Sequence, residues 1–165
     1  MTFRSPSGEP LSARSGVALS LPEDMLEALA VGALLHDLGK VGVPRAVLQK
    51  AGPLSARQRC LVEQHVLIGE RIGRRLWLPS PVLAILRSHH ERWDGSGYPD
   101  RLIGKAIPLL ARVVSIADVY DALTSPRSYR QPWPSDEARR YLLDHAGRWF
   151  DPRLVQAWDT LRQHP

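Results

Sequence analysis

The stretch ALLHDLGK, residues 33–40, places an imidazole beside a carboxylate inside an apolar segment with helical periodicity. Such groups are costly to bury unless partners replace the water that they lose. Similar residues recur along the chain, and they form a set of six potential metal ligands: His36, Asp37, His65, His89, His90 and Asp118. Imidazole nitrogens and carboxylate oxygens suit manganese, iron, zinc and related divalent ions, whereas thiolates are nearly absent. The pattern therefore predicts a metal-dependent hydrolase.

Apolar residues recur at helical spacing along most of the chain. This periodicity and the capping signals predict helices over residues 22–39, 55–76, 80–89, 108–123, 135–147 and 151–161. A loop with brief order around 41–48 follows the first helix, and a turn-rich loop covers 94–99. We find no alternating strand pattern and no repeat. The sequence thus predicts an all-α bundle of about six helices. It forms a single domain over residues 21–165, after a flexible lead-in over residues 1–20 that is rich in Ser, Gly, Pro and Arg.

Composition narrows the class of protein. At 165 residues with 44% apolar content, the chain can bury one core as a globular domain. Cys60 is the only cysteine, which excludes an intrachain disulfide and fits a reducing compartment. The sequence has no apolar run of membrane-span length and no signal peptide, so we expect a cytoplasmic protein with no membrane partner. The net charge of +5 comes from dispersed basic residues, a pattern that disfavours binding to nucleic-acid polymers.

The positions of the potential ligands indicate how such a site would work. His36 and Asp37 diverge by about 100° on a helix, so they can straddle one cavity, and a carboxylate between imidazoles can bridge two ions. A lone histidine would more simply be a satisfied core residue, but five further candidates favour the metal site. Asp118 lies in a very apolar segment, and Asp121 shares its helix face. Two ions suit phosphodiester cleavage, and Lys40 would serve a phosphate oxygen or donate a proton.

Longer motifs resemble one known family, the HD superfamily, and within it the HD-GYP branch. Four blocks carry the resemblance: residues 35–44 (LHDLGKVGVP), 89–99 (HHERWDGSGYP), 118–130 (DVYDALTSPRSYR) and 147–152 (GRWFDP). The first is similar to the His-Asp signature of the superfamily, and the second matches the signature of the branch. The resemblance covers roughly residues 18–162, with the motifs in the order of the family.

The resemblance to HD-GYP domains implies an HD-type helical bundle around two or three ions of iron, manganese or a similar metal. It implies hydrolysis of the bacterial second messenger cyclic di-GMP to pGpG and further to GMP. By this similarity all six potential ligands bind metal, and Asp37, Lys40 and Asp121 act in catalysis. The nucleotide would be contacted by Tyr98, Asp121, Arg127 and Arg130. The Gly-Tyr-Pro loop would also be a docking surface for a diguanylate cyclase or an adaptor protein.

Local chemistry agrees with these roles and leaves alternatives open. Arg127 and Arg130 suit phosphate oxygens or guanine edges, but they are equally compatible with a plain surface pair. Asp121 can orient the attacking water or pair with a base. Tyr98 can stack on a base and donate a hydrogen bond from its hydroxyl.

The chain departs from the family at its N-terminal end. The family usually begins with a helix whose histidine completes one metal site, and the equivalent position lies near Arg4. No histidine precedes His36, and residues 5–10 are a poor helix, with Glu9 a weak substitute ligand. We expect either an N-terminally truncated form or a domain that lost this helix. We then expect two ions rather than three, and an opened apolar face covered by a dimer mate, a partner or an upstream domain.

Two hypotheses from different classes follow. In the first, the chain is a metal-dependent cyclic di-GMP phosphodiesterase, which the complete set of later ligands favours. In the second, it is a catalytically impaired domain that binds cyclic di-GMP or a protein partner and acts as a regulator, which the missing first helix favours. A phosphohydrolase for another nucleotide is disfavoured by the Gly-Tyr-Pro loop at residues 97–99.

Overall fold

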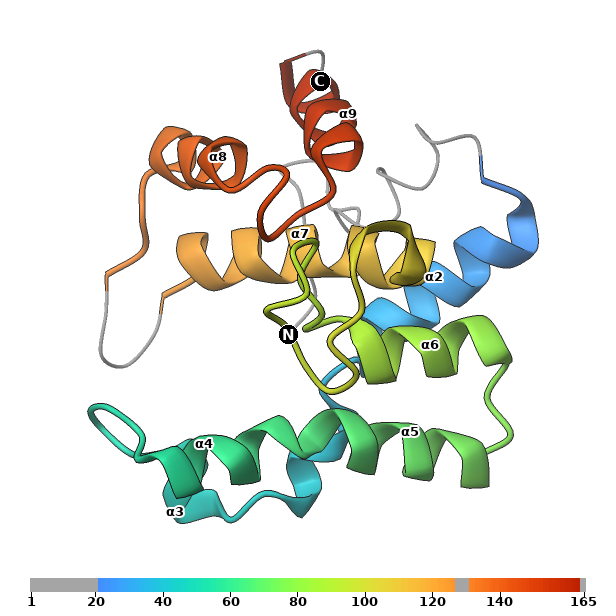
Figure 1. The fold of residues 1–165 in the computed structure, drawn as a ribbon, viewed down its shortest axis with the longest axis vertical. Helices are drawn as coiled ribbons and strands as arrows, with labels where there is room; N and C mark the ends of the chain where they lie inside the picture. The colour runs from blue at the N-terminus through green and yellow to red at the C-terminus, as the bar shows by residue number, and fades with distance from the viewer. Residues whose placement is uncertain (1–20, 127–130, 164–165) are drawn as a thin grey trace.

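The computed structural model describes residues 21–126 and 131–163, and this part of the chain is helical with no β-strand (Figure 1). The elements are α2 (Glu23–Leu35), η1 (Leu38–Gly42), α3 (Arg45–Leu48), α4 (Ala56–Glu63), α5 (His65–Arg75), α6 (Ser80–Ser88), η2 (Gly104–Ala106), α7 (Leu109–Thr124), α8 (Ser135–Asp144) and α9 (Pro152–Gln163). The predicted all-α fold is confirmed. Its six predicted helices correspond to α2, α4 with α5, α6, α7, α8 and α9. Within the described residues, no helix is both long enough and apolar enough to cross a membrane.

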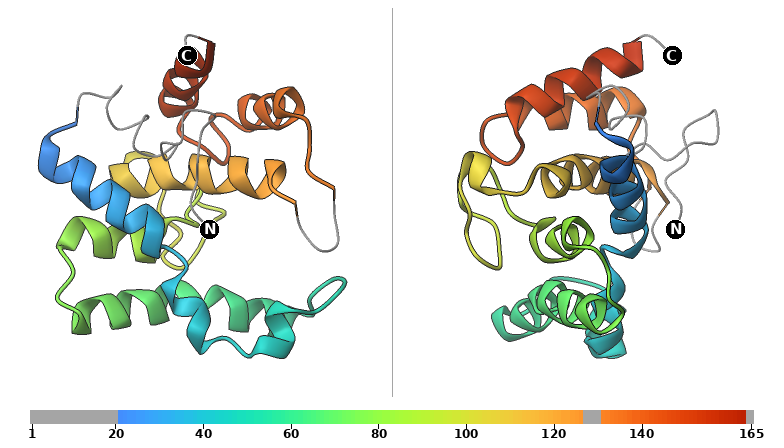
Figure 2. Two further views of the ribbon diagram at one scale, coloured as in Figure 1. Left: turned by 180° about the vertical axis from the view of Figure 1, so that it is seen from behind. Right: turned by 90° about the vertical axis from the view of Figure 1, so that its right-hand side faces the viewer.

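The helix α7 is the centre of the bundle. Helices α6 and α5 are stacked in that order on one side of it, and α8 and α9 lie on the other (Figures 1 and 2). The helix α2 contacts both α6 and α7. Most of the α7 side chains are buried, and they form one core with the inner faces of α2, α6, α8 and α9. A polar residue on α7 is therefore held in a rigid, largely dry position.

Prolines mark where five of the described helices begin. The residues are Pro22, Pro44, Pro79, Pro108 and Pro134, each directly before the first helical residue. Each has a φ between −53° and −57° and an extended ψ, which separates the preceding segment from the helix. These residues define where the preceding loops end and the helices begin.

The helix predicted over residues 55–76 begins as expected and is divided once. Ser55 Oγ accepts a hydrogen bond from the backbone N–H of Gln58 at 3.3 Å, and Gln58 Oε1 accepts one from the Ser55 N–H at 3.0 Å, which confirms the predicted capping box. The division falls at Gln64, between α4 and α5. His65 is consequently the first residue of α5, next to the break.

A glycine allows η1 to contact α5 through the backbone. A Cβ atom on Gly39 would overlap the carbonyl oxygen of His65 and would lie 2.5 Å from the backbone nitrogen of Gly69. Only a residue without a side chain fits this approach. Because Gly39 lies two residues after Asp37, the same contact brings the Asp37 carboxylate next to His65.

We predict that Gly39→Ala lowers the free energy of unfolding by about 3 kcal/mol, because the added methyl group must push two backbone segments apart. Denaturant titration followed by circular dichroism measures the change. Gly52→Ala is the control, since a Cβ at Gly52 meets nothing within 4 Å and only the backbone conformation at φ +117° opposes it. That variant should lose only about 1 kcal/mol. Equal losses in the two variants would contradict the proposed close packing.

Candidate metal centre

Five of the six potential ligands lie at or next to helix ends, and these ends meet beside the sixth ligand, which lies on α7. Their positions are the C-terminal end of α2 (His36, Asp37), the start of α5 (His65), the C-terminal end of α6 (His89, His90) and the middle of α7 (Asp118). Side chains that are distant in the sequence therefore converge on one point. The structure thus brings together all six residues that the sequence predicted as ligands.

Four of these residues form a tight donor cluster. One donor atom from each of Asp37, His65, His89 and His90 lies within 4.8 Å of the other three. The Nε2 atoms of His65 and His89 are 3.4 Å apart. Asp37 Oδ1 lies 3.5 Å from His65 Nε2. This geometry is compact enough for a single ion to bind all four groups.

Backbone carbonyls determine which nitrogen of each histidine faces the centre. The Nδ1 atoms of three histidines lie close to carbonyl oxygens of their own or the preceding helix: His36 to Ala33 at 2.7 Å, His65 to Val62 at 2.7 Å and His89 to Ile85 at 3.0 Å. A carbonyl only accepts, so we place the proton of each neutral ring on Nδ1. The Nε2 atoms of His65 and His89 are then both lone-pair acceptors, and neither can donate to the other.

A buried carboxylate oxygen completes this arrangement. Among the described residues, Asp37 Oδ1 is buried without a hydrogen-bond partner. An anionic oxygen that faces two imidazole lone pairs is unfavourable unless a cation lies between them. A divalent ion with nitrogen and oxygen ligands satisfies all of these acceptors at once. The donor set therefore fits a metal ion, and the fixed Nδ1 protons are the usual outer support of such a site.

The second oxygen of Asp37 faces a second group of ligands. His36 Nε2 lies 3.5 Å from Asp37 Oδ2 and 3.6 Å from Asp118 Oδ1. The Asp37 carboxylate thus has one oxygen toward His65 and the other toward His36, as a bridging ligand requires. Lys40 Nζ also donates to Asp37 Oδ2, at 2.5 Å. The ammonium group is therefore held at the centre, beside the oxygen that would bind a second ion.

Burial and neighbouring charges shift the pKa values of the histidines in the two halves of the cluster in different directions. Burial lowers the pKa of His89 to about 4 and lowers the pKa values of His65 and His90 as well, so these rings are neutral ligands at pH 7. Burial alone would also lower the pKa of His36, but the hydrogen bond and charge of Asp118 raise it overall. Burial alone would raise the pKa of Asp118, but its interactions with His36, His90 and His89 hold it well below its usual range.

A cavity of about 570 Å³ opens beside the cluster, within the range of about 300–1,000 Å³ that is usual for ligand sites. His89, His90 and Tyr98 contribute to its wall. The Tyr98 ring lies 5.0 Å from the His90 ring, with an angle of 31° between their planes. Burial raises the pKa of the Tyr98 hydroxyl, which therefore stays protonated as a hydrogen-bond donor. Tyr98 thus borders the cavity, and its contact with a ligand stays a prediction.

The loop that carries Tyr98 is anchored by its own glycine and by a buried acid. A Cβ on Gly97 would lie 2.6 Å from the carbonyl oxygen of His90, so the loop packs directly on the backbone of the histidine pair. Glu91 is buried, and its two carboxylate oxygens accept hydrogen bonds from the N–H groups of Asp100 at 2.7 Å and Leu102 at 3.0 Å. The role of Glu91 was not predicted from the sequence, although its place directly after the two histidines was a signal.

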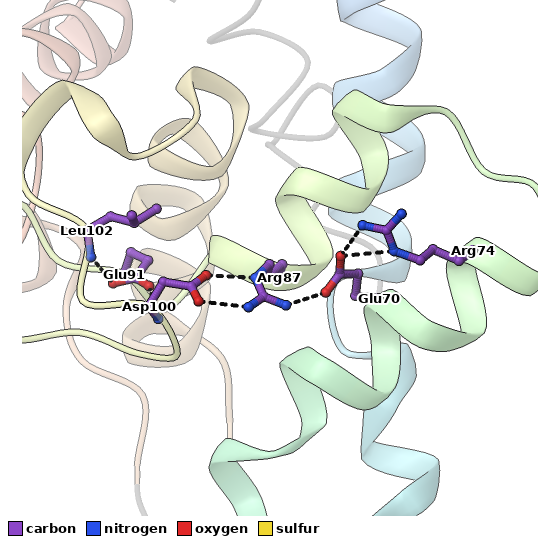
Figure 3. Close-up of polar contacts among 6 residues, drawn as sticks. All are labelled: Glu70, Arg74, Arg87, Glu91, Asp100 and Leu102. Carbon is purple, nitrogen blue, oxygen red and sulfur yellow. Dashed lines mark hydrogen bonds and ion pairs between the residues drawn. The ribbon is translucent and has the colours of Figure 1, made fainter.

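Ion pairs extend this anchor to two helices (Figure 3). Arg87 on α6 makes two hydrogen bonds of 2.7 Å to the Asp100 carboxylate and one of 2.5 Å to Glu70 on α5. Glu70 also accepts from Arg74 one turn further along α5, at 2.6 Å. This network joins α5, α6 and the loop, and the sequence does not reveal it because Glu70, Arg87 and Asp100 are 17 and 13 residues apart along the chain.

The remaining predicted residues have different outcomes. Asp121 lies on α7 three residues after Asp118, and its Oδ1 accepts a hydrogen bond of 2.9 Å from Ser125 Oγ. Its role toward a water or a base stays a prediction. Arg127 and Arg130, the predicted phosphate or guanine contacts, lie outside the described residues, as does the predicted lead-in with Glu9.

Comparison with known proteins places this site in context. The family model described as HD domain matches residues 4–154. The chain is 44% identical over 142 residues to the cyclic di-GMP phosphodiesterase response regulator RpfG of Xanthomonas campestris, covering 84% of this chain and 37% of that protein. It is 41% identical over 147 residues to the 3'3'-cGAMP-specific phosphodiesterase 2 of Vibrio cholerae, covering 84% and 28%. The chain thus spans about a third of the length of these curated relatives.

A solved structure gives the same result. An HDG"Y"P protein from Bdellovibrio bacteriovorus matches with a TM-score of 0.73 and 26% sequence identity, covering 93% of this chain and 49% of that chain. Since the match extends over nearly all of this chain, the likeness includes the arrangement of the helices whose ends carry the ligand cluster.

We predict that Asp37→Ala removes bound metal, because this carboxylate faces both halves of the cluster with its two oxygens. The protein would be loaded with manganese, dialysed and analysed by plasma mass spectrometry, and the variant should retain only background metal. Asp144→Ala, at an exposed aspartate at the end of α8, should retain the content of the unaltered protein. An Asp37→Ala protein with full metal content would contradict the bridging role.

We further predict that the network around Glu70 stabilises the fold in a pH-dependent way. Burial alone would raise the pKa of Glu70, but the hydrogen bonds from Arg74 and Arg87 lower it overall. A folded-state pKa below the ordinary value of about 4.3 gives stability that is present above that pH and is lost as the pH falls through the folded value.

Glu70→Gln should therefore lower the free energy of unfolding by about 1 kcal/mol at pH 7. The difference from the unaltered protein should shrink once the pH falls below about 4. Urea titrations at several pH values measure this, with Glu27→Gln on the exposed face of α2 as the control. A Glu70→Gln deficit that is the same at every pH would show that the loss comes from packing and not from charge.

Proposed function

The chain belongs to the HD domain family and to its HD-GYP branch, and from that premise we propose that it is a metal-dependent phosphodiesterase for cyclic di-GMP. The observation that carries the proposal is the Asp37 carboxylate. Its two oxygens face two histidine-containing groups of ligands, 3.5 Å away on each side. The site opens on a cavity large enough for a nucleotide. A paired metal site beside such a cavity fits hydrolysis of a phosphodiester.

The proposed centre holds two divalent ions, iron or manganese. One would be held by His65, His89, His90 and Asp37, and the other by His36, Asp118 and Asp37. When bound, such ions lower the pKa of a water molecule and stabilise charge on the phosphoryl oxygens. The protein itself fixes the ligand geometry through the Nδ1 hydrogen bonds and keeps three of the rings neutral by burial.

Other residues would act on the substrate directly. Lys40 Nζ lies 2.5 Å from the Asp37 carboxylate that the two ions would share. When substrate binds, this ammonium group would move from Asp37 to a phosphoryl oxygen. Tyr98 would stack on a base and donate its hydroxyl proton in a hydrogen bond, while Asp121 would orient the attacking water. Arg127 and Arg130 would contact the nucleotide. The products would be pGpG and then GMP.

The choice of cyclic di-GMP follows the relatives. The names of several curated relatives specify cyclic di-GMP, and others specify 3'3'-cGAMP. Both are cyclic dinucleotides, so the substrate class has broader support than the individual base. The cytoplasmic location, docking of a diguanylate cyclase or adaptor at the Gly-Tyr-Pro loop, and a dimer mate stay predictions.

A second function is supported by one contact. The Lys40 ammonium group lies on Asp37 Oδ2, the oxygen assigned to the second ion, and it competes for that oxygen. If the second ion binds weakly for this reason, the chain is a catalytically impaired domain that binds cyclic di-GMP or a protein partner as a regulator. The two functions differ in turnover, not in binding.

The purified chain would be loaded with manganese, or with ferrous iron under anaerobic conditions. We expect it to convert cyclic di-GMP to pGpG, and chromatography of the reaction mixture measures the product. Asp118→Ala should abolish turnover. Lys40→Met should lower kcat by about 100-fold with little change in KM, because its cation acts on charge that develops in the transition state. If the fully metal-loaded chain shows no turnover but calorimetry still detects binding of cyclic di-GMP, the phosphodiesterase proposal is wrong and the regulator proposal holds.

A further inference from the structure

We propose that Arg92, Tyr141 and Trp149 form a stacking subsite for the second base of a cyclic dinucleotide. These three residues line the same cavity as His89 and His90. They come from three places in the chain: the segment after the histidine pair, the helix α8, and the loop before α9. The inference rests on the proposed function, since it assigns the part of the ligand that lies away from the metal centre.

The three side chains present flat surfaces that support one another. The Arg92 guanidinium carbon lies 4.1 Å from the centre of the Trp149 ring. His145 stacks against Trp149 at 4.1 Å and against Tyr141 at 4.2 Å, with tilts of 34° and 33°. Tyr141 and Trp149 meet at 5.9 Å with their planes at 61°, which makes a corner. All three cavity-lining side chains are half-buried, so part of each stays accessible from the cavity.

The backbone holds this wall in place. The N–H of Trp93 donates to the carbonyl of Trp149 at 3.1 Å, and the N–H of Asp94 donates to the carbonyl of Arg148 at 2.9 Å. The segment that carries Arg92 is thus paired directly with the segment that carries Trp149. A preformed wall loses little conformational entropy when a ligand binds, so less of the stacking energy is lost to ordering.

The chemistry of the wall fits a nucleobase. Every base has a π-face that stacks on aromatic rings and on guanidinium planes. A cyclic dinucleotide carries two bases on separate sugars. With one phosphate at the ligand cluster and one base at Tyr98, we place the other base against Arg92 and Trp149, which line the same cavity.

Stacking has a further consequence for selectivity. It is tolerant of base identity, because it uses the face of the base and not its edge. The subsite should therefore strengthen binding of cyclic di-GMP and 3'3'-cGAMP by similar factors. Selection between guanine and adenine would have to come from residues that contact the base edges.

The test compares Trp149→Ala with the unaltered metal-loaded chain on cyclic di-GMP, 3'3'-cGAMP and the base-free diester bis(p-nitrophenyl) phosphate. We expect KM for both dinucleotides to rise about tenfold, within the roughly 5- to 150-fold range that stacking of one base provides, with kcat nearly unchanged. Turnover of the base-free diester and metal content should stay the same. Trp149→Phe keeps a ring and should restore most of the affinity.

Two further variants separate recognition from folding. Trp77→Ala changes a tryptophan that is 91% exposed on the α5–α6 turn and should leave every constant unchanged. Arg92→Met keeps most of the side-chain length without the guanidinium plane and should raise the dinucleotide KM severalfold. Unchanged affinity for the dinucleotides in the Trp149→Ala or Arg92→Met protein would overturn the proposed subsite. An equal rise in KM for the base-free diester would overturn it as well.

Calorimetry of cyclic di-GMP binding makes the test independent of turnover. A chain that binds without hydrolysis, and binds about tenfold more weakly as Trp149→Ala, supports the subsite while the proposed hydrolysis fails. Hydrolysis with the same Kd in both proteins supports the enzyme while the subsite fails. A chain that does not bind the dinucleotide at all overturns both proposals.

Discussion

The packing of the helices around the ligand cluster depends on one carboxylate, Asp37, which must be contacted by a different histidine at each of its two oxygens. Asp37 has 3.5 Å contacts to His65 through one oxygen and to His36 through the other. The first contact exists only because the backbone of η1 touches that of α5 at Gly39, where no side chain would fit. The contact between Asp37 and His36 requires that α2 end at His36, at a point where α2 packs beside α7. The position of three helices is thus tied to a single side chain.

The substrate side of the site is held by a separate set of contacts. Buried Glu91 fixes the loop after the histidine pair, and Arg87 ties that loop to α5 through Asp100 and Glu70. None of these residues touches the ligand cluster in the contacts described above. The loop with Tyr98 is therefore placed relative to the helices that carry the histidines, so ligand geometry and cavity shape are set together.

Much of the ligand set could be predicted from the sequence because it obeys local rules. His65 is in phase with apolar neighbours, and Asp118 lies in an apolar helix where an isolated carboxylate is unfavourable. The Arg87–Asp100 pair and the Arg92–Trp149 contact could not be predicted in this way, since each joins segments whose proximity depends on tertiary packing. The break at Gln64 was also missed, because α4 and α5 share one apolar pattern across it.

Helix direction explains why these particular ends meet. His36 and His89 are the C-terminal cap residues of α2 and α6, and the C-terminal end of a helix carries a partial negative charge. Two such ends pointing at one place favour a bound cation there. His65 stands at the opposite kind of end, the start of α5, but its Nδ1 lies 2.7 Å from a carbonyl of α4, which offsets the unfavourable direction. The backbone thus contributes to cation binding beyond the six side chains, and it does so only while these helices end where they do.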